Sequence, residues 1–423
     1  MKQQPEAAPS EEKADMPVVP LAPQRSVLIM RVFTALFWFT NALTLPYAST
    51  FAKELGADNF VAGIIVSAYS VAPIFIRWMI GIVADKLRLR RIFVIGGALL
   101  LFLSMSLIFF SGSIPGLFIG RLGQGIAAST WVCTTVLYSS YFLPKDSVSA
   151  MGQLNACNSL GNLTGYFLGG LVSNHFGLRS IYLLALVGGL LGTLLSLLIK
   201  EVSVEPVLPS KREILLAVKA KYLLLIGFFA LIGQFIQGST NWGFTAQLAT
   251  SLGGNTMQIA FCSLSYTIPG LLVSVLVLPR LIRCFGQKRT AILTSTAAAI
   301  FCILLPTSQS LPMLYFLCFL LGTAHNLNYA LLMGLAIIYF PEKIRAVAMG
   351  IMQSIYSLGL LLGPILAGYV SEYVSLKAAF VVIGAVALLS PLAAIILYDP
   401  AERNTREMLL CETDRFAQQN DRK

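Results

Sequence analysis

The sequence predicts an all-α integral membrane protein with 12 transmembrane helices arranged as two six-helix repeats. Three observations lead to this fold class: a series of long apolar segments, a one-sided distribution of basic residues, and an internal repeat. Of the 423 residues, 57% are hydrophobic and 12% are charged, whereas about 25% of the residues in a typical soluble domain are charged. The composition therefore indicates a chain that is embedded in lipid.

The apolar segments are each about 20 residues long, which is the length that a helix needs to cross a bilayer. We predict spans over residues 27–50, 59–84, 92–112, 115–142, 149–173, 179–199, 222–243, 256–279, 290–307, 311–340, 346–371 and 376–398. Residues 1–26 are polar and rich in Pro and Glu, so we predict a disordered cytoplasmic tail. The predicted domains are an N-terminal bundle over 27–199, a central cytoplasmic loop over 200–221, a C-terminal bundle over 222–398 and a cytoplasmic tail over 399–423.

The distribution of Lys and Arg predicts the orientation, because short cytoplasmic loops of membrane proteins are rich in these residues. If both termini are cytoplasmic, the outer loops contain only Lys53, Arg179 and Lys377 of the 30 Lys and Arg residues. We therefore expect a multi-pass protein of the cell (inner) membrane with both termini in the cytoplasm. The net charge of +11 then reflects anchoring at the lipid bilayer, and we expect no nucleic-acid partner.

The repeat is visible as identities at a constant offset of 198 residues. Ala150-Met151-Gly152 recurs as Ala348-Met349-Gly350, Ser159-Leu160-Gly161 recurs as Ser357-Leu358-Gly359, and Gly165 and Gly170 recur as Gly363 and Gly368. Two parallel repeats of six helices are typical of secondary transporters, whose substrate site lies between the repeats near the middle of the membrane.

A strongly basic turn follows the second predicted span, with the sequence Gly81-Ile-Val-Ala-Asp85-Lys86-Leu-Arg88-Leu-Arg90-Arg91. It resembles the loop signature of the major facilitator superfamily, Gly-x-x-x-Asp-Arg/Lys-x-Gly-Arg-Arg/Lys, and the chain is similar to that family over nearly all of residues 27–398. Arg88 stands where the family usually has Gly. The resemblance implies that Asp85 and its basic neighbours latch the two halves together in the outward-facing state. The cations would also fix the topology without any gating role.

The fourth span contains Gly120-Arg121-Leu-Gly-Gln124-Gly125, which is similar to the family signature Arg-x-x-x-Gly. Arg121 lies roughly 10 Å into this span. A charge at that depth is costly without a cavity or a partner, so it indicates a functional residue. The resemblance to drug/proton antiporters implies a role in proton coupling or in recognition of substrate charge. Alternatively, Arg121 donates to helix carbonyls and braces the packing.

Small residues four positions apart let helices approach closely. The fifth span contains Gly161, Gly165, Gly169 and Gly170, which resemble the antiporter signature Gly-x-x-x-Gly-Pro-x-x-Gly-Gly except that Tyr166 replaces the Pro. The other half has the related residues Gly359, Gly363 and Pro364. We predict that these residues pack helices together. The resemblance favours multidrug efflux, although helix packing alone would explain the glycines.

Polar residues within spans tend to face a cavity, and residues three, four or seven apart share a helix face. On this basis the candidate cavity residues come from the first, fourth, seventh and tenth spans, which line the central cavity in the family. They are Asn41, Gln124, Gln234, Gln237, Asn241, Asn328 and Tyr329. Any one of them could instead form a hydrogen bond between helices.

None of the 19 acidic residues lies deep within a span. Asn41 occupies the region of the first helix in which many proton-coupled relatives carry a carboxylate. Proton coupling would then use His325, Asp85, an outer carboxylate or the substrate itself. His325 is the candidate whose ordinary pKa lies near neutrality. It is also a coupling or substrate-charge candidate together with Arg121, unless it is a neutral His held between helices.

We predict a secondary transporter that works by alternating access and is not an enzyme. The sequence has no nucleotide-binding loop, and its two His residues are far apart, so we expect no cofactor and no metal site. The leading function is proton-coupled efflux of small amphipathic organic compounds by a monomer. The alternative is a permease for a small organic anion or metabolite, because a cavity with Arg121 and His325 but no carboxylate would attract anions. Arg77 would add to this charge unless its role is architectural.

Overall fold

The computed structural model describes residues 22–87, 89–143, 146–202, 211–336, 338, 340 and 342–420. The first group of helices, called the N-terminal helices, comprises α1 (Gln24–Thr44), α2 (Ala48–Glu54), α3 (Asn59–Leu87), α4 (Arg90–Ser111), α5 (Ile114–Ser129), α6 (Trp131–Ser139), α7 (Ser147–Phe176) and α8 (Arg179–Ser196). The second group, called the C-terminal helices, comprises α10 (Lys221–Ser239), α11 (Thr245–Ser251), α12 (Thr256–Leu276), α13 (Leu278–Leu304), α14 (Leu311–Leu335), α15 (Glu342–Tyr373), α16 (Leu376–Ala387) and α17 (Leu389–Asn420).

The described residues form helices and no strand, and nine helical segments are long and apolar enough to cross a membrane. An all-helical membrane protein is thereby confirmed. The three predicted spans outside these nine correspond to α5 with α6, to α7 and to α12. Thr130 separates α5 from α6, so neither of these two helices is long enough alone. The count of 12 stays a prediction.

The exterior of the helices is apolar, as contact with lipid requires. Large hydrophobic side chains are exposed on both groups of helices, among them Phe75, Phe110, Leu194, Phe316 and Ile396. Exposed apolar surface on this scale would be a liability in water, whereas in a bilayer it lies against hydrocarbon.

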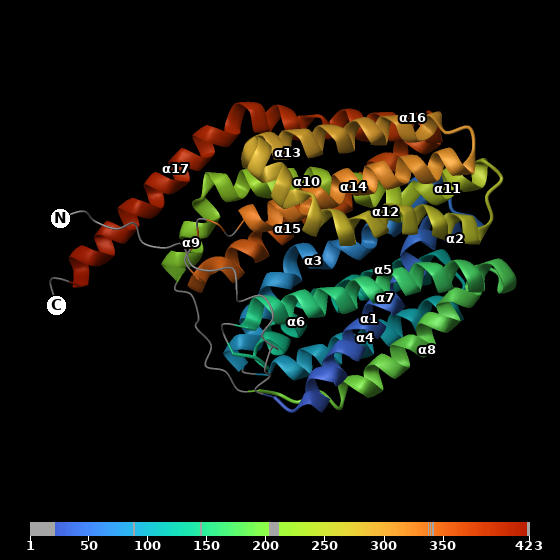
Figure 1. Ribbon diagram of the computed structural model, residues 1–423. Coiled ribbons are helices and arrows are strands. Elements are labelled where there is room, and N and C mark those ends of the chain that lie inside the picture. The colour runs from blue at the N-terminus through green and yellow to red at the C-terminus, as the bar shows by residue number, and fades with distance from the viewer. Residues whose placement is uncertain are drawn as a thin grey trace.

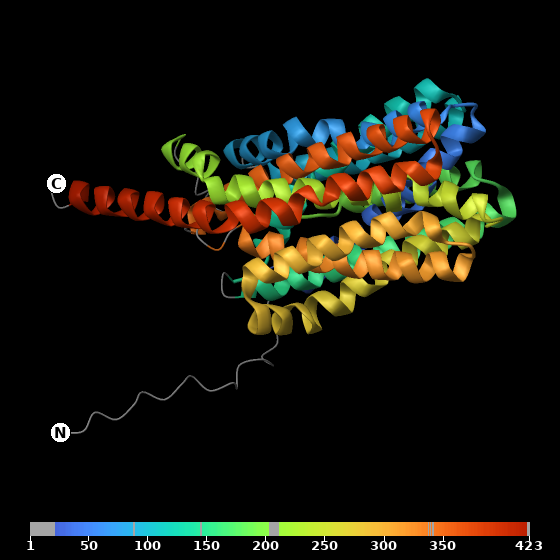
Figure 2. The same ribbon diagram turned by 90° about the horizontal axis from the view of Figure 1, so that it is seen from above.

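Two polar segments that flank the C-terminal helices contain helix. The predicted central loop over 200–221 includes α9 (Lys211–Lys219), and the predicted tail over 399–423 continues α17 as far as Asn420. In Figures 1 and 2, α17 projects beyond the other helices at the same end of the molecule as α9. Residues 1–21 of the predicted N-terminal tail lie outside the described residues.

The segment between the predicted spans 256–279 and 290–307 is helical, whereas the sequence predicts a loop there. Residues 279–289 lie within α13, and the helix is interrupted at Gly286, whose φ is 76°. This left-handed conformation is strained for residues with a Cβ and is readily adopted by glycine. A single glycine therefore bends the chain, while the residues on both sides remain helical.

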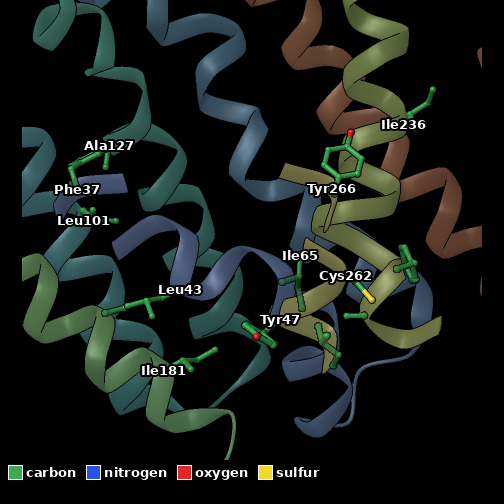
Figure 3. Packing of buried hydrophobic residues seen from close by; sticks show 14 of the residues in the cluster. Phe37, Leu43, Tyr47, Ile65, Leu101, Ala127, Ile181, Ile236, Cys262 and Tyr266 are labelled. Carbon is green, nitrogen blue, oxygen red and sulfur yellow. The ribbon is translucent and has the colours of Figure 1, made fainter. Parts of the chain in front are cut away.

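The two groups of helices meet along two pairs (Figure 1): α3 lies against α15, and α7 lies against α12. Within the N-terminal group α1 packs against α7, and within the C-terminal group α10 packs against α15. Figure 3 shows Tyr47 and Ile65 of the first group beside Cys262 of the second, all members of one buried apolar cluster. The hydrophobic core is thus continuous across the boundary between the groups.

The predicted glycines of α7 lie against the backbone of α1. A Cβ added at Gly161 would meet the carbonyl oxygen of Ala35 at 2.3 Å, and one added at Gly165 would meet that of Phe39 at 2.7 Å. Gly169 continues the row and would place a Cβ 3.1 Å from the carbonyl oxygen of Leu43. The two helices cross so closely that no side chain fits between them.

The corresponding glycines of α15 make the same contact with α10. A Cβ at Gly359 would lie 2.0 Å from the carbonyl oxygen of Leu231, and one at Gly363 would lie 2.4 Å from that of Phe235. In both halves, therefore, two glycines four residues apart meet two carbonyl groups four residues apart. The repeat found in the sequence corresponds to a repeated helix crossing.

We expect Gly359→Ala to lower the stability of the purified protein by about 1–3 kcal/mol, because the added methyl group has no space against α10. The measurement is the melting temperature in detergent. Gly350→Ala is the matched control in the same helix, since no atom lies within 4 Å of its added Cβ. Equal melting temperatures for the two variants would contradict the close crossing of α10 and α15.

Candidate substrate and coupling site

Arg121 in α5 is fully buried among the N-terminal helices. Its Nη1 donates to Oε1 of Gln124 at 2.8 Å, and its Nη2 donates to the carbonyl oxygen of Val66 at 3.3 Å. The guanidinium carbon lies 5.1 Å from the ring centre of Tyr69. Its Nε has no acceptor among the described residues. Arg121 is therefore held by neutral groups of α3 and α5, and its charge is not balanced by a carboxylate there.

Gln124 links this arginine to α1. Its Nε2 donates to Oγ1 of Thr44 at 3.1 Å and to the carbonyl oxygen of Asn41 at 3.5 Å. The amide of Asn41 donates to the carbonyl oxygen of Phe37 at 3.0 Å, while its Oδ1 has no donor among the described residues. The polar faces predicted on the first and fourth spans thus meet inside the N-terminal helices.

His325 and Asn328 in α14 are buried within the C-terminal helices. Oδ1 of Asn328 accepts from Thr294 at 3.2 Å. Both side chains line a small cavity of about 10 Å³, whose other lining residues are Ile232, Gly233, Ile236, Ser295, Ala298 and Ser390. A space of this size holds about one water molecule. His325 and Asn328 can therefore share a water that connects α14 to α10, α13 and α17.

A row of aromatic rings begins at His325. Its imidazole is stacked on Tyr329, with ring centres 6.2 Å apart and planes at 8°, and lies 5.6 Å from the ring of Tyr266. Tyr329 in turn lies 6.1 Å from Tyr356 of α15. The structure thus places the two predicted charge candidates, His325 and Arg121, in different groups of helices, each with its own polar partners.

The candidates of the seventh span lie near the end of α10 and in the π-helical turn Thr240–Phe244 that follows it. Gln234 and Asn241 are buried and Gln237 is half-buried, and no hydrogen bond joins these three side chains to another described residue. Trp242 of the same turn meets Tyr69 of α3 edge to face at 5.7 Å. π-helical turns are frequent at functional sites, and this one carries Asn241 beside the contact between Trp242 and Tyr69 that joins the two groups.

Sequence reasoning missed the interaction that joins α3 to α15 through Arg77. Its Nη1 donates to the hydroxyl of Tyr356 at 2.7 Å and to Oε1 of Gln353 at 3.2 Å, and its guanidinium carbon lies 5.8 Å from the Tyr356 ring. The sequence indicates a buried charge at Arg77 but does not identify Gln353 or Tyr356 as its partners. The sequence signal that could have indicated this interaction is the charge of Arg77, because a charge within a span is costly unless it has a partner.

The loop motif is described in part. The backbone of Gly81 and Asp85 belongs to α3, whereas the contacts of the Asp85 side chain are not among those that the structure describes. Lys86 is exposed and Arg90 is buried. Arg91 contacts the end of its own half, since its backbone N–H donates to Glu201 at 2.6 Å and its guanidinium donates to the carbonyl oxygen of Leu197 at 2.9 Å. The latch between the halves stays a prediction.

The second half has a related contact, in which Lys288 pairs with Asp399 at 2.6 Å. Asp399 follows Glu201 at the same offset of 198 residues, and Lys288 follows Arg90 at that offset. Each basic segment therefore contacts an acid of its own group of helices, Glu201 after α8 and Asp399 in α17.

The two groups of helices are also joined at the end that carries the loops 55–58, 252–255 and 374–375. The backbone N–H of Asn59 donates to Glu372 at 2.8 Å, and the hydroxyl of Tyr47 donates to the carbonyl oxygen of Thr256 at 3.2 Å. Ser49 donates to the carbonyl oxygen of Gly243. The molecule is closed at this end, which the distribution of charge predicts to be the outer one.

Close backbone contacts reinforce this closure. A Cβ at Gly63 in α3 would lie 2.3 Å from the carbonyl oxygen of Pro364 in α15, and one at Gly368 would lie 2.5 Å from that of Asn59. On the other side of the boundary, a Cβ at Gly170 would meet the Cβ of Ala260 at 2.4 Å. Gly170 and Pro364 thus contact the opposite group of helices, in addition to the packing within each half that the sequence predicted.

Two helical groups that meet along a polar boundary, with further polar clusters inside each group, have the architecture of a secondary transporter. The sequence pattern of the Major Facilitator Superfamily matches residues 27–244 and 223–408. The chain belongs to this superfamily.

Two bacterial relatives are named as multidrug transporters. The multi-drug resistance efflux pump PmrA of Streptococcus pneumoniae is 32% identical over 204 residues, which cover 44% of this chain and 51% of the pump. The chain therefore matches about half the length of that relative. The multidrug resistance protein MdtG of Escherichia fergusonii is 27% identical over 362 residues, which cover 82% of this chain and 88% of that protein.

Solved structures share the fold at low sequence identity. The nucleoside transporter NupG has a TM-score of 0.72 at 16% identity, covering 88% of this chain and 99% of that one. The human organic anion transporter MFSD10 (TETRAN) has a TM-score of 0.64 at 17% identity, covering 88% of this chain and 100% of that one. At these identities the likeness extends to the fold alone.

We expect Gln124→Leu to destabilise the protein by about 3 kcal/mol, because it removes the acceptor of Nη1 and leaves the buried Arg121 charge with the carbonyl oxygen of Val66 as its described acceptor. The measurement is the melting temperature of the purified protein. Gln237→Leu is the matched control, since Gln237 is half-buried and makes no hydrogen bond to another described residue. If both leucine variants melt at the same temperature, the Arg121 network does not stabilise the N-terminal helices.

Proposed function

We propose that the protein exports small amphipathic organic compounds across the cell (inner) membrane, by alternating access driven by the proton gradient. The observation that carries this proposal is Arg121, a fully buried arginine whose partners are neutral groups of α3 and α5. A charge retained at that depth implies a function that needs it. The multidrug relatives and the glycine pattern of α7 support efflux as that function.

The two groups of helices act in this proposal as the two halves that rock around the boundary, with both termini in the cytoplasm. Closure at the loops 55–58, 252–255 and 374–375 supports a state that receives substrate from the cytoplasm, as an exporter requires. The free amides of Gln234, Gln237 and Asn241 are proposed to contact the substrate, and the Asp85 motif is proposed to close the opposite end. A monomer contains both halves and is sufficient for this cycle.

His325 is the proposed proton carrier. It lies beside a cavity for about one water, and the row of rings through Tyr329 and Tyr356 connects it to the boundary between the halves. An imidazole in water accepts and releases a proton near neutral pH. Protonation of His325 would change the packing of α14 against α10 and thereby couple the proton to the movement of the halves.

We expect His325→Gln to abolish proton movement linked to substrate while facilitated diffusion of the substrate continues. The measurement is substrate-induced pH change in proteoliposomes that contain a pH-sensitive dye. His175→Gln is the matched control, because His175 is the other histidine and is exposed at the end of α7. Proton movement that persists in His325→Gln would exclude His325 as the carrier.

A permease for a small organic anion is the second candidate. The observation that favours it is that Arg77 and Arg121 are both buried, and no described carboxylate lies within salt-bridge distance of either. Two unbalanced guanidinium groups make the centre of the molecule positive and attractive to anions.

A substrate panel in proteoliposomes with an imposed pH gradient separates the two candidates. For efflux we expect proton release when lipophilic cations or neutral drugs are added. We expect Arg121→Ala to reduce this release at least about tenfold, which corresponds to the loss of one charge-assisted hydrogen bond. Arg121→Lys keeps the charge but not the two directed hydrogen bonds, and it provides a second variant if the alanine protein does not fold. Movement of organic anions alone would favour the permease, and unchanged flux in both variants would remove Arg121 from the mechanism.

A further inference from the structure

The hydrogen bonds of Arg77 cross the boundary between the two halves, and they must break if the halves separate there. Arg77 belongs to α3, whereas its acceptors Gln353 and Tyr356 belong to α15. Arg77 lies roughly 27 Å along α3 from Asn59, which bonds to Glu372 at the closed end. The hydrogen bonds of Arg77 are therefore far from that end. They are also separate from the Arg121 network, which stays within the N-terminal helices.

The guanidinium of Arg77 retains unused hydrogen-bonding capacity. A guanidinium has five N–H donors in a fixed planar arrangement. Both observed bonds use Nη1, and Nε is buried without an acceptor among the described residues. The side chain is 7% exposed, and Nε is the donor that is shielded from water. A planar anion could bind the guanidinium in bidentate fashion, through Nη1 in place of these two neutral acceptors and through a donor that they leave unused.

The surroundings of Arg77 are neutral and aromatic. Its guanidinium stacks on Tyr356 at 5.8 Å, and Tyr329 lies 6.1 Å from that ring. Tyr69 is close enough to Arg77 and Arg121 to interact electrostatically with both, and Trp242 packs on its edge. A buried cation among neutral groups is stabilised further by an anion than by another dipole. An aromatic body attached to that anion would match the rings.

We propose that Arg77 is the substrate-recognition residue, that it binds a planar oxyanion carried on an aromatic compound, and that this group replaces Tyr356 and Gln353 as its acceptor. Binding then exchanges a contact between the halves for a contact with the substrate. The assignment rests on the second candidate function, transport of an organic anion, and adds to it the class of anion and the step that releases α3 from α15.

The test uses the full-length protein and two probes of the same shape, 2-naphthoate and its uncharged amide, 2-naphthamide. Binding is measured by ligand-induced thermal shift and by calorimetry in detergent. We expect the carboxylate to bind and the amide to bind at least about tenfold more weakly, as for loss of a charge-assisted hydrogen bond. Equal binding of acid and amide would overturn the proposal.

Two variants are expected to change the affinity in opposite directions. Arg77→Gln removes the cation and should abolish the preference for the carboxylate. Tyr356→Phe keeps the ring but removes the competing hydroxyl, and it should tighten carboxylate binding about tenfold, because the anion no longer displaces a hydrogen bond to a charged group. If the Arg77 contact only stabilises the structure, both variants should bind the carboxylate more weakly. That result would contradict the proposal that the anion replaces Tyr356 and Gln353 as acceptor.

Arg179→Gln is the matched control. Arg179 also stacks on an aromatic ring, Phe109, at 5.3 Å, and donates to its carbonyl oxygen, but it is exposed and its partner lies in the same half. This variant should bind the carboxylate as the unmodified protein does. Loss of the acid–amide difference in Arg179→Gln would show a general effect of positive charge and would overturn the assignment to Arg77.

Transport assays separate this proposal from the wider function. If the protein moves 2-naphthoate equally well in Arg77→Gln, the transport function stands and Arg77 recognition is wrong. If carboxylate binding depends on Arg77 but no compound is transported, recognition stands and the transport function is wrong.

Discussion

Burial of positive charge without a carboxylate is the constraint on which the polar interior depends. Arg121 and Arg77 lie in segments that are otherwise apolar, and both are held by carbonyl, amide and hydroxyl oxygens and by tyrosine rings. An isolated ion in such surroundings costs several kcal/mol, even after the structure relaxes. Each guanidinium therefore determines how the helices around it are placed, because any shift that removes an oxygen exposes this cost.

The two arginines impose this constraint in different ways. The partners of Arg121 come from α3 and α5, with Gln124 extending the network to α1, so the network can move as one body with the N-terminal helices. The partners of Arg77 belong to α15 and cannot move with it. One cation stabilises a half, whereas the other stabilises one arrangement of the two halves.

Much of the fold could be predicted from the sequence because it depends on backbone and composition. The length of the apolar segments predicts the helices. The offset of 198 residues predicts equivalent glycines in the two halves, and these glycines lie against α1 and α10 in the same way. Glycine packing is predictable because the contact needs only the absence of a side chain. The break at Thr130 and the helical form of residues 279–289 were not predicted, since hydropathy reports burial in lipid and is insensitive to one interrupted turn.

The candidate site was predictable where partners lie close together on the chain. Arg121 and Gln124 are three residues apart on one helix, and their pairing follows from that spacing. Arg77 and Tyr356 are 279 residues apart, and no periodicity within α3 indicates which helix of the other half it meets. His325 was recognised as a titratable group, but its water-sized cavity depends on the absence of a side chain at Gly233 in α10. Contacts between distant helices are set by the packed fold.

The crossing of α3 and α15 explains how few interactions can decide between two conformations. At Gly63 and Gly368 the two backbones touch without interlocking side chains, so the helices can roll on each other at low cost. Hydrogen bonds on either side of this contact then decide which end is closed: Asn59 with Glu372 at one end, and Arg77 with Tyr356 towards the other. Each is worth about 0.5–3 kcal/mol, and a ligand shifts the balance only by the difference in its affinity for the two states. A substrate that accepts hydrogen bonds from Arg77 would bind the two states with different affinities, because it competes with Tyr356 for the same donors.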